Sequence, residues 1–217
     1  MLVKTLGNQN TILDQFIAEV RDVQIQQDSM RFRRNMERIG EIFAYEISKE
    51  LDYRATQVTT SLGVADVPML ADYPVIATIL RAGLPLHAGM LHFFDRSSNA
   101  FVSAYRRYHK EGSFDIKVDY ASCPNIEGKV LILSDPMLAT GLSMHLCYKE
   151  IISNGKPSHT HFVSLLASVE GVEFMKRKFK GSDSTLWVGV IDAELTAQAY
   201  IVPGLGDAGD LAFGVKN

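Results

Sequence analysis

The sequence contains few cysteines and no long hydrophobic run, and both absences restrict the class of protein. Its two cysteines, Cys123 and Cys147, are far apart and form no C-x-x-C motif. Two isolated thiols indicate a reducing compartment, so we expect a cytoplasmic protein without a disulfide scaffold or a zinc cluster. The apolar runs at 75–80 and 130–133 are strand-sized, far shorter than the roughly 20 residues of a membrane-spanning helix. The N-terminal stretch MLVKTLGNQN shows no apolar segment with a cleavage site, so we expect no signal peptide.

An excess of positive charge is also missing. The formal net charge of the 217 residues is −3, with an isoelectric point near 6.1, which makes an RNA-binding regulator the least favoured function and predicts no nucleic-acid or membrane partner. Hydrophobic residues make up 47% and charged residues 22%, the balance of a globular protein. A mass of 24.1 kDa is the size of one large domain, and we expect a single domain over residues 1–217.

Histidine spacings typical of metal sites are absent as well. None of the six histidines forms an H-x-x-x-H or H-E-x-x-H motif. His159 and His161 lie two residues apart on a predicted strand and therefore share one face, which leaves a metal pair as an alternative. We favour two histidines at exposed or edge positions.

Hydrophobic periodicity separates a helical beginning from an alternation of strands and helices. We expect an N-terminal helical region at 1–56, whose main helix spans 29–51, begins at a cap formed by Asp28 or Ser29, and presents a solvated face of arginines. Strands are predicted at 57–62, 73–80, 100–105, 129–134, 159–167 and 185–191, with helices at 84–94, 143–153 and 169–179.

The predicted strands are continuous apolar runs, which is typical of strands buried on both faces of a sheet. Strands that alternate with helices predict the α/β class, with a Rossmann-like, open, mostly parallel sheet flanked by helices. The polar segment 106–125, which contains Gly112 and Pro124, interrupts this pattern. We interpret it as a mobile, protruding β-hairpin.

Two loops at predicted strand ends carry residues suited to phosphate chemistry. The run KVLILSDPMLATGLSM at 129–144 places Asp135 after a strand and small residues before a helix, where backbone amides can bind a phosphate. An ordinary strand-to-helix turn with a capping aspartate fits this spacing equally well. Arg81 follows the strand at 73–80, and its guanidinium matches phosphate geometry, although an arginine in solvent is the alternative.

The C-terminal segment is rich in glycine and has no good helix or strand former after Val202. Glycine content alone would also fit a disordered tail. Ile201, Leu205 and Phe213 are too apolar for such a tail, so we predict an ordered backbone that approaches a ligand closely. Amides and carbonyls of such a backbone can match the polar edge of a nucleobase.

Three stretches together resemble the uracil phosphoribosyltransferases, which belong to the type I phosphoribosyltransferases. The run SDPMLATGLS at 134–143 is similar to the family's loop for phosphoribosyl pyrophosphate (PRPP), and ILRAGL at 79–84 is similar to its pyrophosphate loop. The run YIVPGLGDAGD at 200–210 resembles its uracil-binding segment nearly residue for residue. With similar residues at Arg31 to Arg33 and at Tyr105–Arg106, the resemblance covers about 28–216.

The resemblance implies a type I phosphoribosyltransferase fold with a small uracil-binding hood at 192–217. It also implies a pentosyl-transfer reaction of pyrimidine salvage, in which uracil and PRPP give UMP and pyrophosphate. Residues 139–143 would bind the 5-phosphate, Asp135 the ribose hydroxyls, and Arg81 with Arg106 the pyrophosphate. The implied PRPP-binding residues are Arg81, Arg106, Asp135, Pro136, Met137, Leu138, Ala139, Thr140, Gly141, Leu142, Ser143 and Asp207. The implied uracil-binding residues are Ile201, Gly206, Asp207 and Ala208.

The resemblance also implies Mg²⁺, bound through PRPP and waters without a direct protein ligand, and no single general base. Family members are commonly dimers or larger, so we expect a homo-oligomer with the helix at 29–51 as a candidate interface. The sequence departs from the family at Leu142, where glycine is usual, at Leu211, where a basic residue is common, and in the segments 105–110 and 192–196.

These departures keep other functions open. A catalytically weak relative that binds UMP or PRPP as a sensor is the main alternative, supported by Leu142 and the altered hairpin. A phosphoribosyltransferase for another base is a further alternative, against which the match at 200–210 argues.

Overall fold

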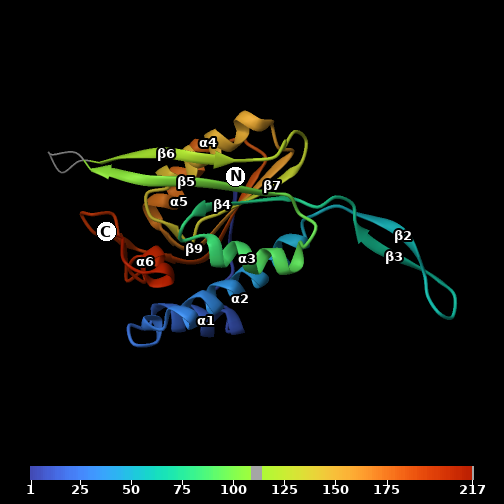
Figure 1. Ribbon diagram of the computed structural model, residues 1–217, viewed down its shortest axis with the longest axis horizontal. Helices are drawn as coiled ribbons and strands as arrows, with labels where there is room; N and C mark the ends of the chain where they lie inside the picture. The colour runs from blue at the N-terminus through green and yellow to red at the C-terminus, as the bar shows by residue number, and fades with distance from the viewer. Residues whose placement is uncertain (109–113, 217) are drawn as a thin grey trace.

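The computed structural model describes residues 1–108 and 114–216, and an eight-stranded sheet forms its centre (Figure 1). The strand order is β1-β10-β9-β7-β4-β5-β6, with β8 paired to β9, and every pair is parallel except β5 with β6. These strands are β1 (Leu2–Thr5), β4 (Val75–Leu80), β5 (Asn99–Tyr108), β6 (Phe114–Ser122), β7 (Val130–Ser134), β8 (Met137–Leu138), β9 (His159–Ser168) and β10 (Ser184–Asp192). The mostly parallel sheet confirms the predicted α/β class.

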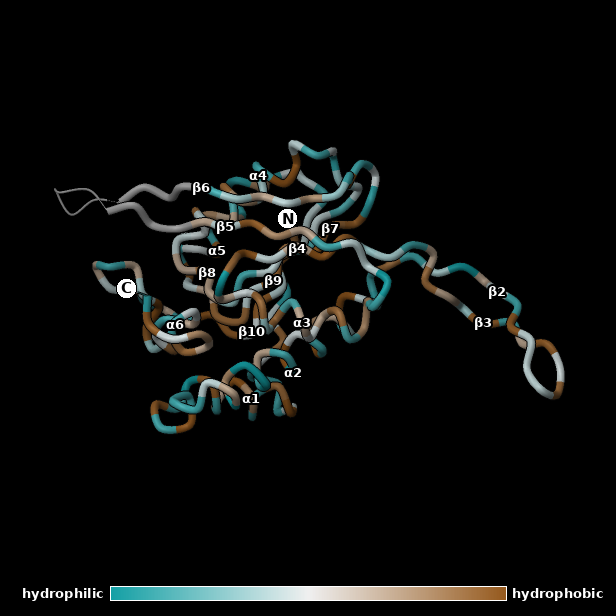
Figure 2. The backbone as a smooth tube through the Cα atoms, viewed as in Figure 1, coloured by the Kyte–Doolittle hydropathy of each residue, from teal (hydrophilic) through white to brown (hydrophobic). Residues whose placement is uncertain are grey.

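Helices cover both faces of this sheet (Figure 1). The α-helices are α1 (Ile12–Arg21), α2 (Ser29–Ser48), α3 (Leu84–Phe93), α4 (Leu142–Ile151), α5 (Val169–Lys178) and α6 (Ala208–Phe213), and the short 3₁₀ helices are η1 (Ile25–Gln27) and η2 (Ile152–Asn154). Ile76 and Ile132 pack with α1, α2 and α3, whereas their chain neighbours such as Ala77 and Leu133 pack with α4 and α5. This alternation explains the continuous apolar runs, because both sides of each central strand are buried. Hydrophobic residues accordingly dominate the central strands (Figure 2).

The long predicted helix is present as α2, and the Asp28 carboxylate caps it by accepting from the amides of Met30 and Arg31. Its basic residues do not all face solvent. Arg34 is exposed, as expected, but Arg33 is half-buried and donates to the carbonyl of Ala212 in α6. The interpretation of a solvated basic face is therefore wrong for Arg33.

The N-terminal region holds strands that the sequence did not reveal. Its first residues form β1, which pairs with β10 at the sheet edge. The strand predicted at 57–62 is instead β2 (Tyr53–Thr59), and it pairs antiparallel with β3 (Val64–Leu70) outside the central sheet. The Thr60 hydroxyl accepts hydrogen bonds from the amides of Leu62 and Gly63 and so stabilises the turn between β2 and β3. We call residues 53–70 the β2–β3 arm, and it projects from the body of the molecule (Figure 1).

The hairpin predicted at 106–125 corresponds to the antiparallel pair β5–β6, which starts earlier than expected because β5 already begins at Asn99. Residues 109–113, at its tip, lie outside the described part of the chain, and the predicted mobility stays a prediction. None of the described helices has both the length and the apolar character needed to cross a membrane.

Candidate active site

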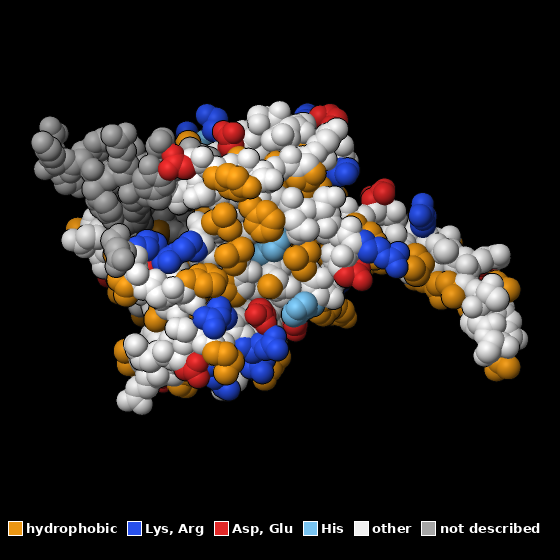
Figure 3. Space-filling model, in the orientation of Figure 1, with side chains coloured by type: hydrophobic (Ala, Val, Ile, Leu, Met, Phe, Trp, Pro, Cys, Tyr) orange, Lys and Arg blue, Asp and Glu red, His pale blue; other side chains and the backbone are white. Residues whose placement is uncertain are grey.

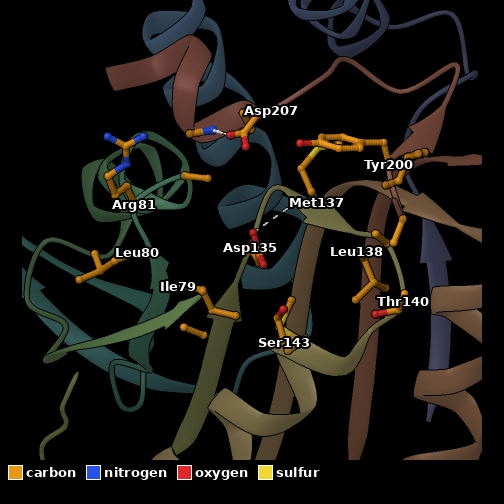
Figure 4. A pocket seen from close by; sticks show the side chains of 18 of the residues that line it. Ile79, Leu80, Arg81, Asp135, Met137, Leu138, Thr140, Ser143, Tyr200 and Asp207 are labelled. Atoms are coloured by element: carbon orange, nitrogen blue, oxygen red, sulfur yellow. Dashed lines mark hydrogen bonds between the residues drawn. The ribbon is translucent and has the colours of Figure 1, made fainter. Parts of the chain in front are cut away.

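A cleft of about 600 Å³ opens where β4 and β7 end, below the C-terminal hood, whose described residues are 192–216 (Figure 4). This edge is where open parallel sheets bind ligands. The predicted site residues that line the cleft are Arg81, Asp135, Met137, Leu138, Ala139, Thr140, Gly141, Ser143, Ile201, Gly206, Asp207 and Ala208. Pro136 and Leu142 do not line it, and the side chain of Arg106, on β5, lies outside the described part of the structure.

Asp135 stands at the centre of the cleft, directly after β7 (Figure 4). Its amide donates to the carbonyl of Val163 at 3.0 Å, which ties it to β9. Among the described residues, its carboxylate accepts a single long hydrogen bond, at 3.5 Å from the amide of Met137. Burial raises the pKa of Asp135 to about 7, because few groups compensate the buried charge. A ligand that brings hydroxyl groups or a cation beside Asp135 would therefore favour its ionised form.

The loop that follows Asp135 is compact and leads directly into α4. Gly141 takes a φ of +79° at the N-cap of α4, and a Cβ there would lie 2.7 Å from a ring carbon of Phe174. Glycine is thus required both by the backbone conformation and by the packing. Leu142 begins the helix and its amide contacts the Thr140 hydroxyl at 3.4 Å. The side chain of Leu142 is not among the groups that line the cleft.

Helix α5 supports this loop from behind. The hydroxyl of Ser168, the N-cap of α5, donates to the carbonyl of Ala139 and accepts from the amide of Gly171. A Cβ on Gly171 would lie 2.5 Å from the carbonyl oxygen of Ala139 and 2.6 Å from that of Leu138. No pattern in the sequence marks Ser168 or Gly171, since both act on the backbone of a loop that is distant along the chain.

Arg81 reaches from the end of β4 toward the hood. The peptide bond before it, Leu80–Arg81, is cis. Its Nη2 donates to Oδ1 of Asp210 at 2.9 Å and to the carbonyl of Gly214 at 3.0 Å. Its Nε is buried and has no hydrogen-bond partner among the described residues. A buried guanidinium donor without a partner is a suitable position for an anionic ligand.

The hood closes the cleft from above and contains secondary structure that we did not expect. Its strands β11 (Glu194–Leu195) and β12 (Ile201–Val202) pair with each other, and α6 begins after Asp207. Oδ1 of Asp207 caps α6 by accepting from the amides of Gly209 and Asp210, while Oδ2 lies 3.7 Å from Nζ of Lys216. The prediction of a segment without helix or strand is therefore wrong, although Gly206, with a φ of +96°, shows the expected backbone turn.

Several residues that line the cleft were not predicted as site residues. Tyr200 and Lys216 come from the hood, and Ser103 and Ala104 come from β5. Figure 4 shows the ring of Tyr200 beside the side chain of Met137. Tyr200 could have been chosen because it begins the glycine-rich segment. No pattern in the sequence marks Lys216.

The remaining candidate sites are not supported. His161 is buried in the middle of the sheet and accepts from Nε1 of Trp187 at 3.0 Å, while Nε2 of His159 lies 3.1 Å from the Thr185 hydroxyl. The expectation of exposed or edge histidines is wrong, because β9 lies between β7 and β10. Among the described residues, no group of three or more potential ligands could hold a metal ion. Cys123 and Cys147 are both free.

Comparisons with known proteins agree with the fold and with the residues in the cleft. Residues 8–215 match the family model described as uracil phosphoribosyltransferase. A uracil phosphoribosyltransferase of Porphyromonas gingivalis is 51% identical over 216 residues, covering 100% of both chains. One from Pyrococcus furiosus is 36% identical over 203 residues, 92% of this chain and 85% of that protein.

A solved structure of a protein from Aquifex aeolicus superimposes with a TM-score of 0.87 at 27% identity, and the match covers 99% of both chains. The structural match extends over the hood as well as the sheet, since it spans nearly the whole chain. Together with the matches in sequence, it confirms the predicted fold, an open and mostly parallel sheet flanked by helices. The chain belongs to the uracil phosphoribosyltransferase family.

Proposed function

We propose that the protein transfers the 5-phosphoribosyl group of PRPP to uracil and releases UMP and pyrophosphate. One observation carries this proposal: the loop at 139–143, Arg81 and the hood segment at 200–208 surround a single cleft. Each of them lies in a stretch that resembles the family, and the relatives in two organisms carry the name of this activity. A binding protein for PRPP alone would not need the hood.

The PRPP end of the cleft would use three groups. The start of α4 and the amides of 139–143 would bind the 5-phosphate, because the N-terminus of a helix stabilises an anion. Asp135 would accept hydrogen bonds from the ribose hydroxyls. Arg81 would bind the pyrophosphate with its unpartnered Nε, and Arg106 would assist from the β5–β6 hairpin.

The uracil end would be formed by the hood. Ile201, Gly206 and Ala208 would present backbone groups to the polar edge of the base, with Tyr200 and Met137 against its face. Figure 4 shows Asp207 between Arg81 and Tyr200. Because its ring would lie against the face of the base, we add Tyr200 to the predicted uracil-binding residues.

The reaction replaces the bond from ribose C1 to pyrophosphate by a bond from C1 to N1 of uracil, and the N1 proton leaves to solvent. Because charge develops on the ribose and on the leaving group, the residues would act by alignment, by charge and by excluding water. Arg81 would neutralise the departing pyrophosphate, and Asp135 would hold the ribose. We assign no single general base.

The residues in the cleft suit a Mg²⁺ ion that takes most of its ligands from the substrate. The carboxylates of Asp135 and Asp207 line the same cleft, but no third ligand accompanies them among the described residues. One or two carboxylates together with substrate oxygens and waters are the usual environment of Mg²⁺. Bound there, it would reduce the charge of the pyrophosphate.

We also propose that the protein is a homodimer or a larger homo-oligomer in the cytoplasm, the compartment that suits its two free thiols. The apolar stripe of α2 is already buried within the chain, so α2 is a poor interface. The β2–β3 arm instead exposes Tyr53, Val64, Met69 and 98% of Leu62, and hydrophobic side chains are visible along it (Figure 3). A two-stranded hairpin is marginally stable on its own, which favours an arm that is covered by another subunit. Light scattering that gave the mass of one subunit would contradict this assignment.

The activity is tested directly by incubating the purified protein with PRPP, Mg²⁺ and one base at a time: uracil, cytosine, hypoxanthine or guanine. UMP formation from uracil alone supports the proposal. Turnover of a different base would contradict the assigned substrate. Calorimetric binding of UMP or PRPP without turnover would favour the sensor alternative, which is otherwise weakened because Leu142 lies outside the cleft lining.

A further inference from the structure

A charged cluster joins helix α1 to the hood, outside the cleft. Arg21, the last residue of α1, binds Asp192, the last residue of β10, through two hydrogen bonds: Nη1 to Oδ2 at 2.9 Å and Nη2 to Oδ1 at 2.8 Å. Arg21 Nη1 also donates to the carbonyl of Gly204 at 3.1 Å. Asp192 Oδ2 accepts from the amide of Gly204 at 3.0 Å. We call these three residues the Gly204 clamp.

The Gly204 clamp satisfies both polar groups of a buried glycine residue. Gly204 is buried, so an unpaired amide or carbonyl there would be strongly unfavourable. It has a φ of +57°, and a Cβ would lie 2.1 Å from the carbonyl oxygen of Ile201, so this turn admits no side chain. The side chain of Asp192 is 6% exposed and that of Arg21 is 20% exposed, which protects the ion pair from water.

The position of Gly204 connects the clamp with the cleft. Ile201 precedes it by a short turn and Gly206 follows it, and both line the cleft. Neither Arg21 nor Asp192 lines the cleft, and α1 lies beside the hood on the side away from β5 and β6 (Figure 1). The clamp therefore fixes the hood backbone relative to β10, a strand of the rigid central sheet, without touching a ligand.

We infer that Arg21 and Asp192 are positioning residues that hold the 201–206 backbone at the geometry needed to bind the base. This inference rests on the proposed function, because it assigns the base to the hood. Binding by backbone groups needs a backbone fixed within a fraction of an ångström, and a bidentate arginine–carboxylate pair supplies such rigidity. The loop at 139–143, at the PRPP end of the cleft, has its own support from α5 and no hydrogen bond to the clamp among the described residues.

The test compares Arg21→Lys with a matched control, Arg31→Lys. Arg31 also forms a two-bond pair, through Nε and Nη2 to Glu19, but has no hydrogen bond to the hood among those described. Lysine keeps the charge in both variants and loses the planar fork. We expect Arg21→Lys to raise KM for uracil about tenfold, the effect of losing one charged hydrogen bond, with KM for PRPP changed less than about twofold. Arg31→Lys should leave both KM values within about twofold.

A second measurement does not depend on turnover. Amide hydrogen exchange of residues 201–206 should accelerate in Arg21→Lys and in Asp192→Asn, but not in Arg31→Lys. Equal effects of Arg21→Lys and Arg31→Lys on both KM values and on exchange would overturn the inference. If wild-type protein made no UMP, the proposed function would fail, while the exchange comparison would still decide whether the clamp positions the hood.

Discussion

Arg81, which lines the cleft, forms an ion pair with Asp210, with Nη2 of the arginine 2.9 Å from Oδ1 of the aspartate. Arg81 belongs to the end of β4 and Asp210 to α6, so this ion pair joins the proposed pyrophosphate loop to the hood. Both side chains are partly exposed, at 38% and 27%, which makes the pair weak enough to exchange for a more highly charged ligand. Such an exchange would couple the entry of PRPP to the position of the hood.

The first prediction concerns the guanidinium of Arg81. Replacing it in Arg81→Ala should raise KM for PRPP by about one to two orders of magnitude, because hydrogen bonds between charged groups are lost. KM for uracil should change much less. Steady-state kinetics with each substrate varied in turn measures both effects. Arg34→Ala, on the exposed face of α2, is the control, and an equal loss in that variant would contradict the assignment.

The second prediction separates the charge of Asp207 from its role in capping α6. Asparagine is as good an N-cap as aspartate, so Asp207→Asn should fold with an unchanged melting temperature. Because the variant lacks the negative charge beside Lys216 and the proposed PRPP site, kcat/KM should fall about tenfold or more. Unchanged kcat/KM in a folded variant would show that the hood assignment is wrong at Asp207.

The third prediction tests the support of the phosphate loop by α5. A methyl group in Gly171→Ala would collide with the carbonyl oxygens of Ala139 and Leu138, both of which belong to the loop backbone. The loop must move, so PRPP binding should weaken about tenfold or more, since a displacement of this size disrupts the alignment of a ligand. Isothermal titration with PRPP measures the change. Gly63→Ala is the control, because a Cβ at Gly63 meets no atom of the described residues within 4 Å, and a similar loss there would contradict the steric explanation.

Much of the central sheet could be predicted from the sequence because its strands are buried on both faces. Runs such as 130–134 have no polar face, and that pattern is hard to produce in another way. The β2–β3 arm could not be placed, since exposed strands with weak alternation resemble loops, and β1 is only four residues long. Local hydrophobic periodicity is therefore insufficient to predict such short or exposed strands.

The residues of the proposed site also form two groups, those that local motifs predict and those that only the folded structure reveals. Asp135, Arg81 and the glycines of the hood stand in local motifs, and the structure brings them to one cleft. Ser168, Gly171 and Arg21 act on those motifs from distant elements, so only the folded chain reveals them. The sequence marks Asp192 only as part of the segment 192–196 that departs from the family, although its carboxylate accepts a hydrogen bond from the hood amide of Gly204.

The fourth prediction concerns the pH dependence of stability. Burial raises the pKa of Asp135 from 3.8 to about 7, so between these values the folded state binds a proton that the unfolded state has lost. The free energy of unfolding contributed by this group therefore falls as pH rises through this interval, on the order of 1 kcal/mol per pH unit at most. Asp135→Asn removes the titration. The stability of the variant relative to wild type should thus increase steadily from about pH 4 to pH 7 and then level off.

Urea unfolding of both proteins without ligands, at a series of pH values, measures this difference. Other titrating groups, including the buried His87 and His161, whose pKa values are lowered by burial, contribute equally to both proteins and cancel. Asp95→Asn, at an exposed carboxyl, is the control and should run parallel to wild type. A constant difference between Asp135→Asn and wild type across this range would mean that Asp135 is already ionised in the empty cleft. Its carboxylate would then need no ligand to become the acceptor for ribose hydroxyls, and Asp135 would add no pH dependence to the binding of PRPP beyond that of the phosphates themselves.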